Sequence, residues 1–453
     1  MNRRQLLQGT IALPVLPSLL AACSDSTPNR YLLDNYAPVA EELTSKALNV
    51  IGELPKDLIG RYLRIGPNPG TEIDPGSHHW FLGRGMVHGI RLDEGRADWY
   101  RSRFIGAPED GNSPNTNVFG FADKTIAAVE SGGLPVELDY ELRSVANNTS
   151  FGGGFTAHPK WDPDADELHA ICYDWANLRD HVRYVVIDST GDLRHEVEIP
   201  LPGMPMVHDM SLTPSYVVIF DLPVTLSFMA LAGGATFPFR WDEEYEPRVG
   251  LLPRNGTAKD IIWSPISPQA VFHPMNAYED AEGRVVIDIM TYRTLFKDDV
   301  RGPFGDSAPR FDRWTINPAT RTVNEEVVDA DAQEFPRCHP ELNGKPYRYG
   351  YTVAVDGYDF PAILKHDLQT GTRETQPLGA GRQGAEPIFV PREDGDAEDE
   401  GYLMTYVFDG NDQRSEFVVY DAQDFSREPL ARVQLPGRVP YGFHGNWVPD
   451  EAV

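Results

Sequence analysis

Four histidines in this sequence share a local context that could bring them to one point. His158, His208, His273 and His444 each follow an apolar or small residue and directly precede a turn-prone or polar one. They are 50, 65 and 171 residues apart. Neutral imidazole nitrogens bind transition metals, so histidines that converge would form a metal site. A single histidine is more often structural, and only the regular spacing favours the metal site.

The sequence lacks the motifs of several common enzyme classes. It contains no His-Glu-x-x-His pair, no Cys-x-x-Cys, no P-loop, no Gly-x-Ser-x-Gly elbow and no Gly-x-Gly-x-x-Gly that opens a helix. Metalloprotease, thiol-redox, nucleotide-dependent and serine-hydrolase chemistry therefore have no support. The other eight histidines are expected to be structural.

Short β-type runs separated by turn residues follow one another along the chain and predict an all-β fold. A strand that runs into a polar turn recurs at Asp188, Asn317, Asp367 and Asp421, which are 129, 50 and 54 residues apart. The first gap is about two units, and a unit of about 50–65 residues fits six to eight blades of a β-propeller. Histidines at matching ends of inner strands would then meet on the propeller axis.

The composition argues against nucleic acid as a partner. The chain has 40 basic and 68 acidic residues and a formal net charge of -28. A surface this negative repels phosphate backbones. Apolar content of 41% and charged content of 24% are ordinary for a globular protein.

The first 23 residues resemble an export signal. Arg3 and Arg4 resemble a twin-arginine motif, residues 11–22 are apolar, and the run that ends at Cys23 resembles the lipobox of a lipoprotein. An ordinary signal peptide is the alternative. We expect residues 24–50 to form a tether and lead-in, and residues 51–453 to form the propeller. We also expect an exported protein with a lipid anchor at the periplasmic face.

Cys172 and Cys338 are expected either to form a disulfide or to be buried thiols.

The chain resembles the carotenoid cleavage oxygenase family over nearly all of residues 50–453. The resemblance rests on the four histidine segments and on further motifs in the same order: residues 60–69, 79–88, 129–135, 334–337 and 384–392. Within residues 79–88 the chain departs from the family, with Leu82 and Arg84 where an acidic residue is frequent.

The resemblance implies a seven-bladed propeller with loops that form a dome for substrate. It implies an Fe(II) on the axis, bound by His158, His208, His273 and His444. It also implies that Glu130, Glu334 and Glu386 hold three of these histidines, with His158 left without a glutamate. Ligating imidazoles need an acceptor on the other ring nitrogen, which agrees with this arrangement.

The resemblance also concerns the open coordination positions. Four nitrogens on a six-coordinate ion leave two sites for O2 and a substrate or water, whereas zinc favours a tetrahedron and has no redox chemistry. Thr116 matches a family threonine whose methyl group crowds one of these sites. A purely structural role for Thr116 is equally compatible with the sequence.

Two positions bear on the substrate. Stilbene-cleaving relatives have a lysine before the first glutamate and a tyrosine upstream to bind a phenol, where this chain has Val129 and Phe104. An apolar carotenoid or apocarotenoid is therefore the expected substrate, cleaved with O2 at one double bond.

The apolar residues 222–239 are expected either to be buried or to contact a membrane. Stilbene cleavage and a non-catalytic polyene-binding lipoprotein remain alternatives, and we expect a monomer.

Overall fold

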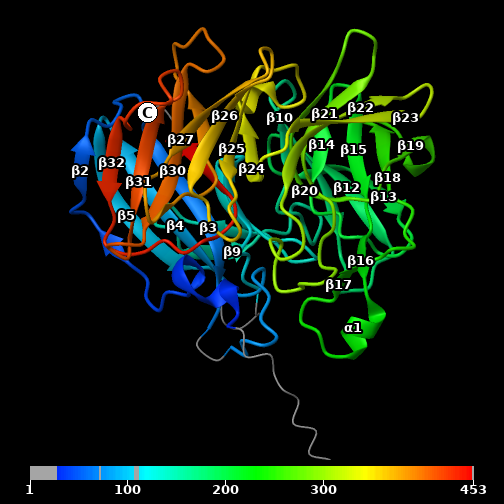
Figure 1. Cartoon of the computed structure of the whole chain (residues 1–453), viewed down its shortest axis with the longest axis horizontal. Coiled ribbons are helices and arrows are strands. Elements are labelled where there is room, and N and C mark those ends of the chain that lie inside the picture. Colours follow the sequence, from blue (N-terminus) through cyan, green and yellow to red (C-terminus); the bar gives the residue numbers. More distant parts are fainter. Residues whose placement is uncertain (1–27, 71–72, 107–111, 451–453) are drawn as a thin grey trace, which may run out of the picture.

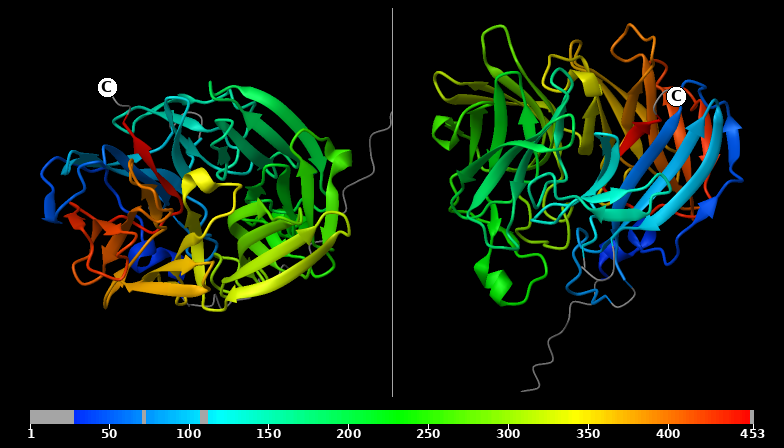
Figure 2. Two further views of the ribbon diagram at one scale, coloured as in Figure 1. Left: turned by 90° about the horizontal axis from the view of Figure 1, so that it is seen from above. Right: turned by 180° about the vertical axis from the view of Figure 1, so that it is seen from behind.

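The computed structural model describes residues 28–70, 73–106 and 112–450, and these form a ring of β-sheets. The predicted signal, residues 1–23, lies outside the described residues. Viewed from above, the sheets follow one another around the ring in chain order (Figure 2, left). Seven sheets of four or more strands are present in the described part of the chain, with one further two-stranded sheet. The predicted all-β, seven-bladed propeller is confirmed.

The first three blades come from the first half of the chain, except for one strand. Blade 1 comprises β1 (Thr44–Ser45), β5 (Arg96–Phe104), β4 (Arg84–Asp93), β3 (Gly60–Asn68) and β33 (Gly445–Pro449). Blade 2 comprises β6 (Asn117–Phe121), β7 (Lys124–Ala128), β8 (Val136–Leu138) and β9 (Ser144–Asn147). Blade 3 comprises β10 (Lys160–Asp162), β11 (Glu167–Tyr173), β12 (His181–Ile187) and β13 (Leu193–Pro200).

The other four blades complete the ring. Blade 4 comprises β14 (Met210–Leu212), β15 (Tyr216–Asp221), β18 (Arg248–Pro253) and β19 (Ile262–Pro265). Blade 5 comprises β20 (Ala270–Glu279), β21 (Val285–Tyr292), β22 (Arg310–Asn317) and β23 (Thr322–Asp329). Blade 6 comprises β24 (Gln333–Cys338), β25 (Tyr349–Ala354), β26 (Ala362–Asp367) and β27 (Thr372–Pro377). Blade 7 comprises β28 (Arg382–Gln383), β29 (Ile388–Pro391), β30 (Gly401–Asp409), β31 (Arg414–Asp421), β32 (Ala431–Gln434) and β2 (Asn49–Gly52).

The two ends of the described chain close the ring. β33 pairs with β3, so that Gly445 lies opposite Arg64, and β2 pairs with β32, so that Val50 lies opposite Val433. Closure by main-chain hydrogen bonds removes the free edges that an open ring would expose. Residues 28–50, expected as a tether and lead-in, are thus a packed part of the propeller. Tyr31 is buried there, in the short helix η1 (Arg30–Leu32), because its ring packs against Trp80.

The sequence repeat corresponds to one turn of the blade. Asp188, Asn317, Asp367 and Asp421 end the third strands of blades 3, 5, 6 and 7, and each side chain accepts hydrogen bonds from backbone N–H groups two or three residues later. Asx turns of this kind favour a tight connection between antiparallel strands. The double-length gap spans blade 4, whose long insertion separates β15 from β18.

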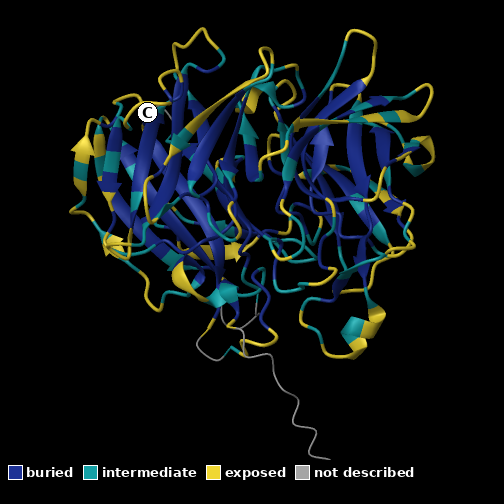
Figure 3. Cartoon of the chain, viewed as in Figure 1, coloured by how far each residue is buried: buried dark blue, intermediate teal, exposed yellow. Residues whose placement is uncertain are grey.

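That insertion contains the apolar segment 222–239. It forms a small hairpin, β16 (Val224–Leu226) and β17 (Phe239–Trp241), with the helix α1 (Phe228–Ala232) between the two strands. β16 is buried and β17 is partly buried, whereas α1 has no buried residue and projects from the lower end of the molecule in Figures 1 and 3. The segment therefore combines a buried part with an exposed apolar helix. None of the helices in the described ranges has the length and apolar character needed to cross a membrane.

Side chains between neighbouring blades form the core. The blade 5 residue Trp314, for example, is fully buried and packs edge-on against Phe220 of blade 4. Replacing such a side chain with alanine lowers the free energy of unfolding by about 3–5 kcal/mol, so these contacts stabilise the packing of adjacent blades.

Cys172 and Cys338, for which the sequence left two alternatives, are free thiols in different blades. The remaining short helices are η2 (Asp34–Tyr36), η3 (Ala258–Asp260) and η4 (Pro340–Leu342).

Candidate metal centre

The four predicted histidines meet at one point. Each offers a ring nitrogen, and these atoms all lie within 4.8 Å of one another in a buried setting. The Nε2 atoms of His208 and His273 are 3.2 Å apart. Metal–nitrogen bonds of about 2.1 Å would separate neighbouring ligand atoms by about 3 Å and opposite ones by about 4.2 Å in an octahedron. The described residues contain one such cluster, and its donor set fits a transition metal ion.

Inner strands of four blades deliver these histidines. His158, His208 and His444 lie one or two residues before β10, β14 and β33, and His273 lies within β20. Pro274 follows His273 and lacks an N–H group, and the pairing of β20 with β21 shifts on both sides of it. Such an irregularity turns a strand residue out of the regular pleat.

Two glycines set the position of His444. A Cβ atom at Gly66 would lie 2.4 Å from the Cα atom of Gly442, so the two backbones can approach only because neither residue has a side chain. The backbone N–H of Phe443 then donates to Ile65 O at 2.9 Å, and that of Ile65 donates to His444 O at 3.1 Å. β3 thereby fixes the backbone that carries His444.

Three glutamates hold three of the histidines, as the family resemblance implied. The Nδ1 atoms lie 2.7, 2.7 and 2.8 Å from a carboxylate oxygen, in the pairs His208–Glu130, His273–Glu334 and His444–Glu386. Each Nδ1–H donates to its carboxylate, which leaves Nε2 with a free lone pair. This fixes both the tautomer and the orientation that a metal ligand requires.

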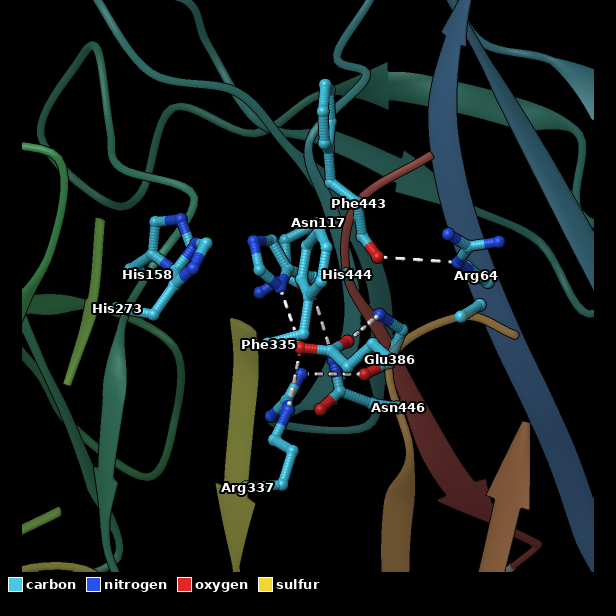
Figure 4. A network of polar contacts seen from close by, with 12 residues as sticks. Arg64, Asn117, His158, His273, Phe335, Arg337, Glu386, Phe443, His444 and Asn446 are labelled. Atoms are coloured by element: carbon cyan, nitrogen blue, oxygen red, sulfur yellow. Dashed lines mark hydrogen bonds and ion pairs between the residues drawn. The ribbon is translucent and has the colours of Figure 1, made fainter. Parts of the chain in front are cut away.

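Further side chains, whose roles the sequence did not predict, hold the glutamates. Tyr173 and Tyr292 donate their hydroxyl groups to Glu130 and Glu334 at 2.6 and 3.1 Å. Arg337 donates to Glu386 at 2.9 Å, as Figure 4 shows, and also donates to the backbone oxygen of Gly445 at 3.0 Å. Arg337 belongs to one of the family motifs, whereas the tyrosines lie on neighbouring strands and no local signal marks them.

Burial and the neighbouring charges set the protonation of the cluster. Burial would raise the pKa of Glu386, but Arg337 and His444 hold it well below its usual range. Burial lowers the pKa of His444 to about 3, although Glu386 opposes this, and burial also lowers the pKa of His158 well below its usual value. For His273, burial would lower the pKa, but Glu334, together with Asp209 and Glu386, raises it above its usual value. His158 and His444 are thus neutral at pH 7, as metal binding requires.

His158 has no glutamate partner, as expected. Its Nδ1 atom lies 3.6 Å from Asp209 Oδ2, and its Nε2 atom lies 3.9 Å from Glu130 Oε1, both beyond hydrogen-bond distance. Asp209 is buried and accepts a hydrogen bond from Lys160 Nζ at 2.8 Å. We did not predict a role for Asp209, although it directly follows His208 in the sequence.

Thr116 lies on the same axis. It directly precedes β6, and its backbone oxygen accepts from the N–H group of His444 at 3.1 Å. Its hydroxyl group donates to Asn115 Oδ1 at 2.8 Å, so that this donor is already used. With Glu334 in β24 and Glu386 just before β29, the inner strand of each of the seven blades, or a residue directly beside it, contributes to the cluster or to its support.

An aromatic cavity of about 230 Å3 opens onto the cluster. It reaches His208, His273 and His444 but not His158, and Thr116, Glu130 and Glu334 line it too. Ten of the lining residues are aromatic: Trp80, Phe81, Tyr173, Trp175, Phe237, Phe272, Tyr292, Phe304, Phe335 and Phe443. Such a wall binds an apolar molecule through burial and leaves few polar groups to orient it.

The other positions named in the sequence analysis lie partly in the aromatic cavity and partly away from it. Val129 lines the aromatic cavity, but Phe104 does not, and its ring instead lies against the guanidinium of Arg84. Leu82, one of the departures from the family motif, also lines the cavity, closer to the candidate site than expected. His79 and His88 are buried outside the cluster, as predicted, and His88 Nδ1 lies 2.8 Å from Tyr100 Oη.

The fold and the cluster define a class: seven-bladed propellers with four histidines on the axis beneath an apolar cavity. Comparison with known proteins agrees. The family described as retinal pigment epithelial membrane protein matches residues 36–109 and 106–449. A carotenoid cleavage oxygenase of Mycobacterium tuberculosis is 38% identical over 505 residues, which covers 95% of this chain and all of that protein. The chain belongs to this family of carotenoid cleavage oxygenases and is an oxygenase enzyme.

Two solved structures are similar throughout. The lignostilbene dioxygenase of Pseudomonas brassicacearum has a TM-score of 0.84 and is 26% identical, covering 94% of this chain and 99% of its own. The cobalt-substituted ACO of Synechocystis has a TM-score of 0.82 and is 27% identical, covering 91% and 97%.

Proposed function

We propose that this chain is an Fe(II)-dependent dioxygenase that cleaves one C=C bond of a carotenoid or apocarotenoid. Both oxygen atoms of O2 enter the products, which are two aldehydes or ketones. The observation that carries the proposal is the four-histidine cluster open to an aromatic cavity. The names of the relatives support the carotenoid class.

His158, His208, His273 and His444 would hold the metal. Four neutral nitrogens would leave the ion able to take further ligands, and bound iron would supply the redox chemistry that activates O2. Glu130, Glu334 and Glu386 orient three of the rings and place negative charge near the cation without binding it. Thr116 lines the cavity with its hydroxyl group turned to Asn115, which supports the proposal that its methyl group narrows one of the open positions.

The aromatic walls would position the polyene and exclude water. The hydroxyl groups of Tyr173 and Tyr292 donate to glutamates, so they are not free to donate to a substrate oxygen. Val129 occupies the position where a phenol-binding lysine is expected in stilbene cleavers. A phenol group would therefore lose hydrogen bonds to water without regaining them, which supports an apolar substrate.

We also propose that the enzyme is exported, lipid-anchored through Cys23 and in contact with a membrane through α1. The motifs in residues 1–23 support export. Phe228 and Met229 of α1 are 57% and 88% exposed, and α1 carries no charged residue. Phe237, in the same segment, lines the aromatic cavity. A lipid-dissolved substrate would then enter without crossing water.

Labelled oxygen tests the reaction. The apoprotein is reconstituted with Fe(II) without air, then given an apocarotenal or a hydroxystilbene under 18O2, and the products are identified by mass. We expect two carbonyl products from the apocarotenal, each with one labelled oxygen. Cleavage of only the hydroxystilbene would replace the substrate class, and binding of the apocarotenal without any product would overturn the catalytic proposal.

A further inference from the structure

A second cavity reaches the histidine cluster from the opposite end of the propeller axis. This axial cavity measures about 590 Å3 and is formed by the inner strands β6, β10, β20, β24, β29 and β33 with the loops that follow or precede them. His273 and His444 line both cavities. His158 lines only the axial cavity, and His208 lines only the aromatic cavity. The cluster thus separates two compartments.

The two cavities differ in chemistry. Beside its apolar residues, the axial cavity carries polar side chains from its mouth to its inner end: Asn117, Lys160, Asp166, Asp209, Arg337, Asn343, Glu386 and Asn446. At the inner end Lys160 and Arg337 are paired with Asp209 and Glu386, so the cations there are neutralised. A hydrated cation loses much less free energy of solvation along such a wall than along the aromatic wall on the other side.

His158, at the boundary, is the least restrained of the four histidines. The other three donate to a carboxylate at 2.7–2.8 Å, whereas both carboxylate contacts of His158 exceed 3.5 Å and its Nε2 atom has no hydrogen-bond partner. A ring without such a bond turns more easily about its side-chain torsions. Asp209 stands beside it and is held by Lys160 and by the backbone N–H of Met210.

We propose that the metal enters and leaves the cluster through the axial cavity, while the apolar substrate uses the aromatic cavity. His158 turns aside to let the ion pass, and Asp209 accepts its Nδ1–H in the displaced position. Asp209 is thus a positioning residue for this ligand. This inference rests on the proposed metal centre, and it assigns to the second cavity a role that catalysis does not require.

Metal exchange in the intact protein tests the route. Holoenzyme loaded with Fe(II) or Co(II) is mixed with an excess of chelator without air, and release is followed by absorbance, with and without a saturating apocarotenal. We expect the same release rate in both cases, because the substrate occupies the other compartment. Slower release with the apocarotenal bound would show that the ion leaves through the aromatic cavity and would overturn the inference.

Variants with a large side chain at the mouth of the axial cavity test the same route through the rates of metal uptake and release. Gly120 and Pro340 are exposed and line the axial cavity, so they lie at its mouth. Gly120→Trp and Pro340→Trp should each slow both uptake and release of the metal several-fold. Pro303→Trp, in the wall of the aromatic cavity, serves as the matched control and should leave both rates unchanged while it alters the KM for the polyene. Equal exchange rates in wild type and in both folded axial variants would overturn the route.

The role of Asp209 has its own readout. Lys160→Met leaves Asp209 free to accept the Nδ1–H of His158 in its displaced position, so release should become faster. Asp209→Ala removes the acceptor, whereas Asp209→Asn retains an oxygen. We expect the uptake rate to fall in Asp209→Ala and to recover in Asp209→Asn. Equal rates in all three variants would remove the positioning role. A wild-type protein that binds no metal would instead refute the proposed function itself, so the two failures are distinguishable.

Discussion

The two sides of the histidine cluster present opposite surfaces, because loops and strand ends line one side and the inner strands line the other. On one side the loops bring ten aromatic residues around a cavity of about 230 Å3, and the tyrosine hydroxyls are bonded to glutamates. On the other side the inner strands expose amides, carboxylates and paired cations around a cavity of about 590 Å3. The comparison teaches that a single ring of sheets can separate an apolar compartment from a polar one across one layer of imidazoles.

The four histidines between the two cavities should give the largest effect on metal binding when they are changed. His273 lines both cavities, so His273→Ala should abolish metal binding and activity. The fold should survive, because the blades are held together by the core side chains between them and not by this histidine. His181→Ala, at a half-buried histidine outside the cluster, is the control. Metal content by mass spectrometry and far-UV circular dichroism check both variants. Full metal content in His273→Ala would contradict the ligand assignment.

The supporting carboxylates differ by side. Glu334 lines the aromatic cavity and Glu386 the axial cavity, and each bonds one histidine. Glu334→Gln and Glu386→Gln should each weaken metal binding by about 10–100-fold. Glu386→Gln should also lower the melting temperature more, since it leaves Arg337 without its charged partner. Titration with Co(II) and thermal unfolding measure the two effects, and equal melting temperatures would show that the Arg337 pair adds no stability.

The aromatic side alone should set the affinity for the polyene. Phe304→Ala removes part of that wall and should raise the KM for an apocarotenal several-fold without changing metal affinity. Phe119→Ala, a matched loss from the wall of the axial cavity, should leave this KM unchanged. Steady-state kinetics and Co(II) titration test both. A similar rise in KM for Phe119→Ala would contradict the claim that only the aromatic cavity binds the polyene.

The smallest expected effect concerns α1, which projects beyond the aromatic side. Phe228→Asp with Met229→Asp should reduce partitioning onto lipid vesicles while metal content stays constant, once the N-terminal segment has been deleted. Val145→Asp places the same charge at another exposed apolar residue, 65% exposed, and should have no effect. Vesicle co-sedimentation measures this. Unchanged partitioning of the α1 variant would remove the proposed membrane contact.

Much of this architecture is readable in the sequence. Asp188, Asn317, Asp367 and Asp421 marked a turn that recurs in four blades, and the motifs around the histidines indicated the family and hence the glutamates. Local signals of this kind survive because a turn or a motif depends on neighbouring residues. Residues 28–50 were predicted less well, since pairing of β2 with a strand almost 400 residues later leaves no local trace.

The sequence by itself indicated which side chains could bind a metal, a repeated unit of short strands and turns, and the family to which the chain belongs. Only the tertiary structure decided that Tyr173, Tyr292 and Arg337 secure the glutamates, that Asp209 stands beside His158, and that two unlike cavities meet at the cluster. The reason is physical: composition and spacing act along the chain, whereas burial, hydrogen-bond distance and the division of space arise when distant strands close into a ring.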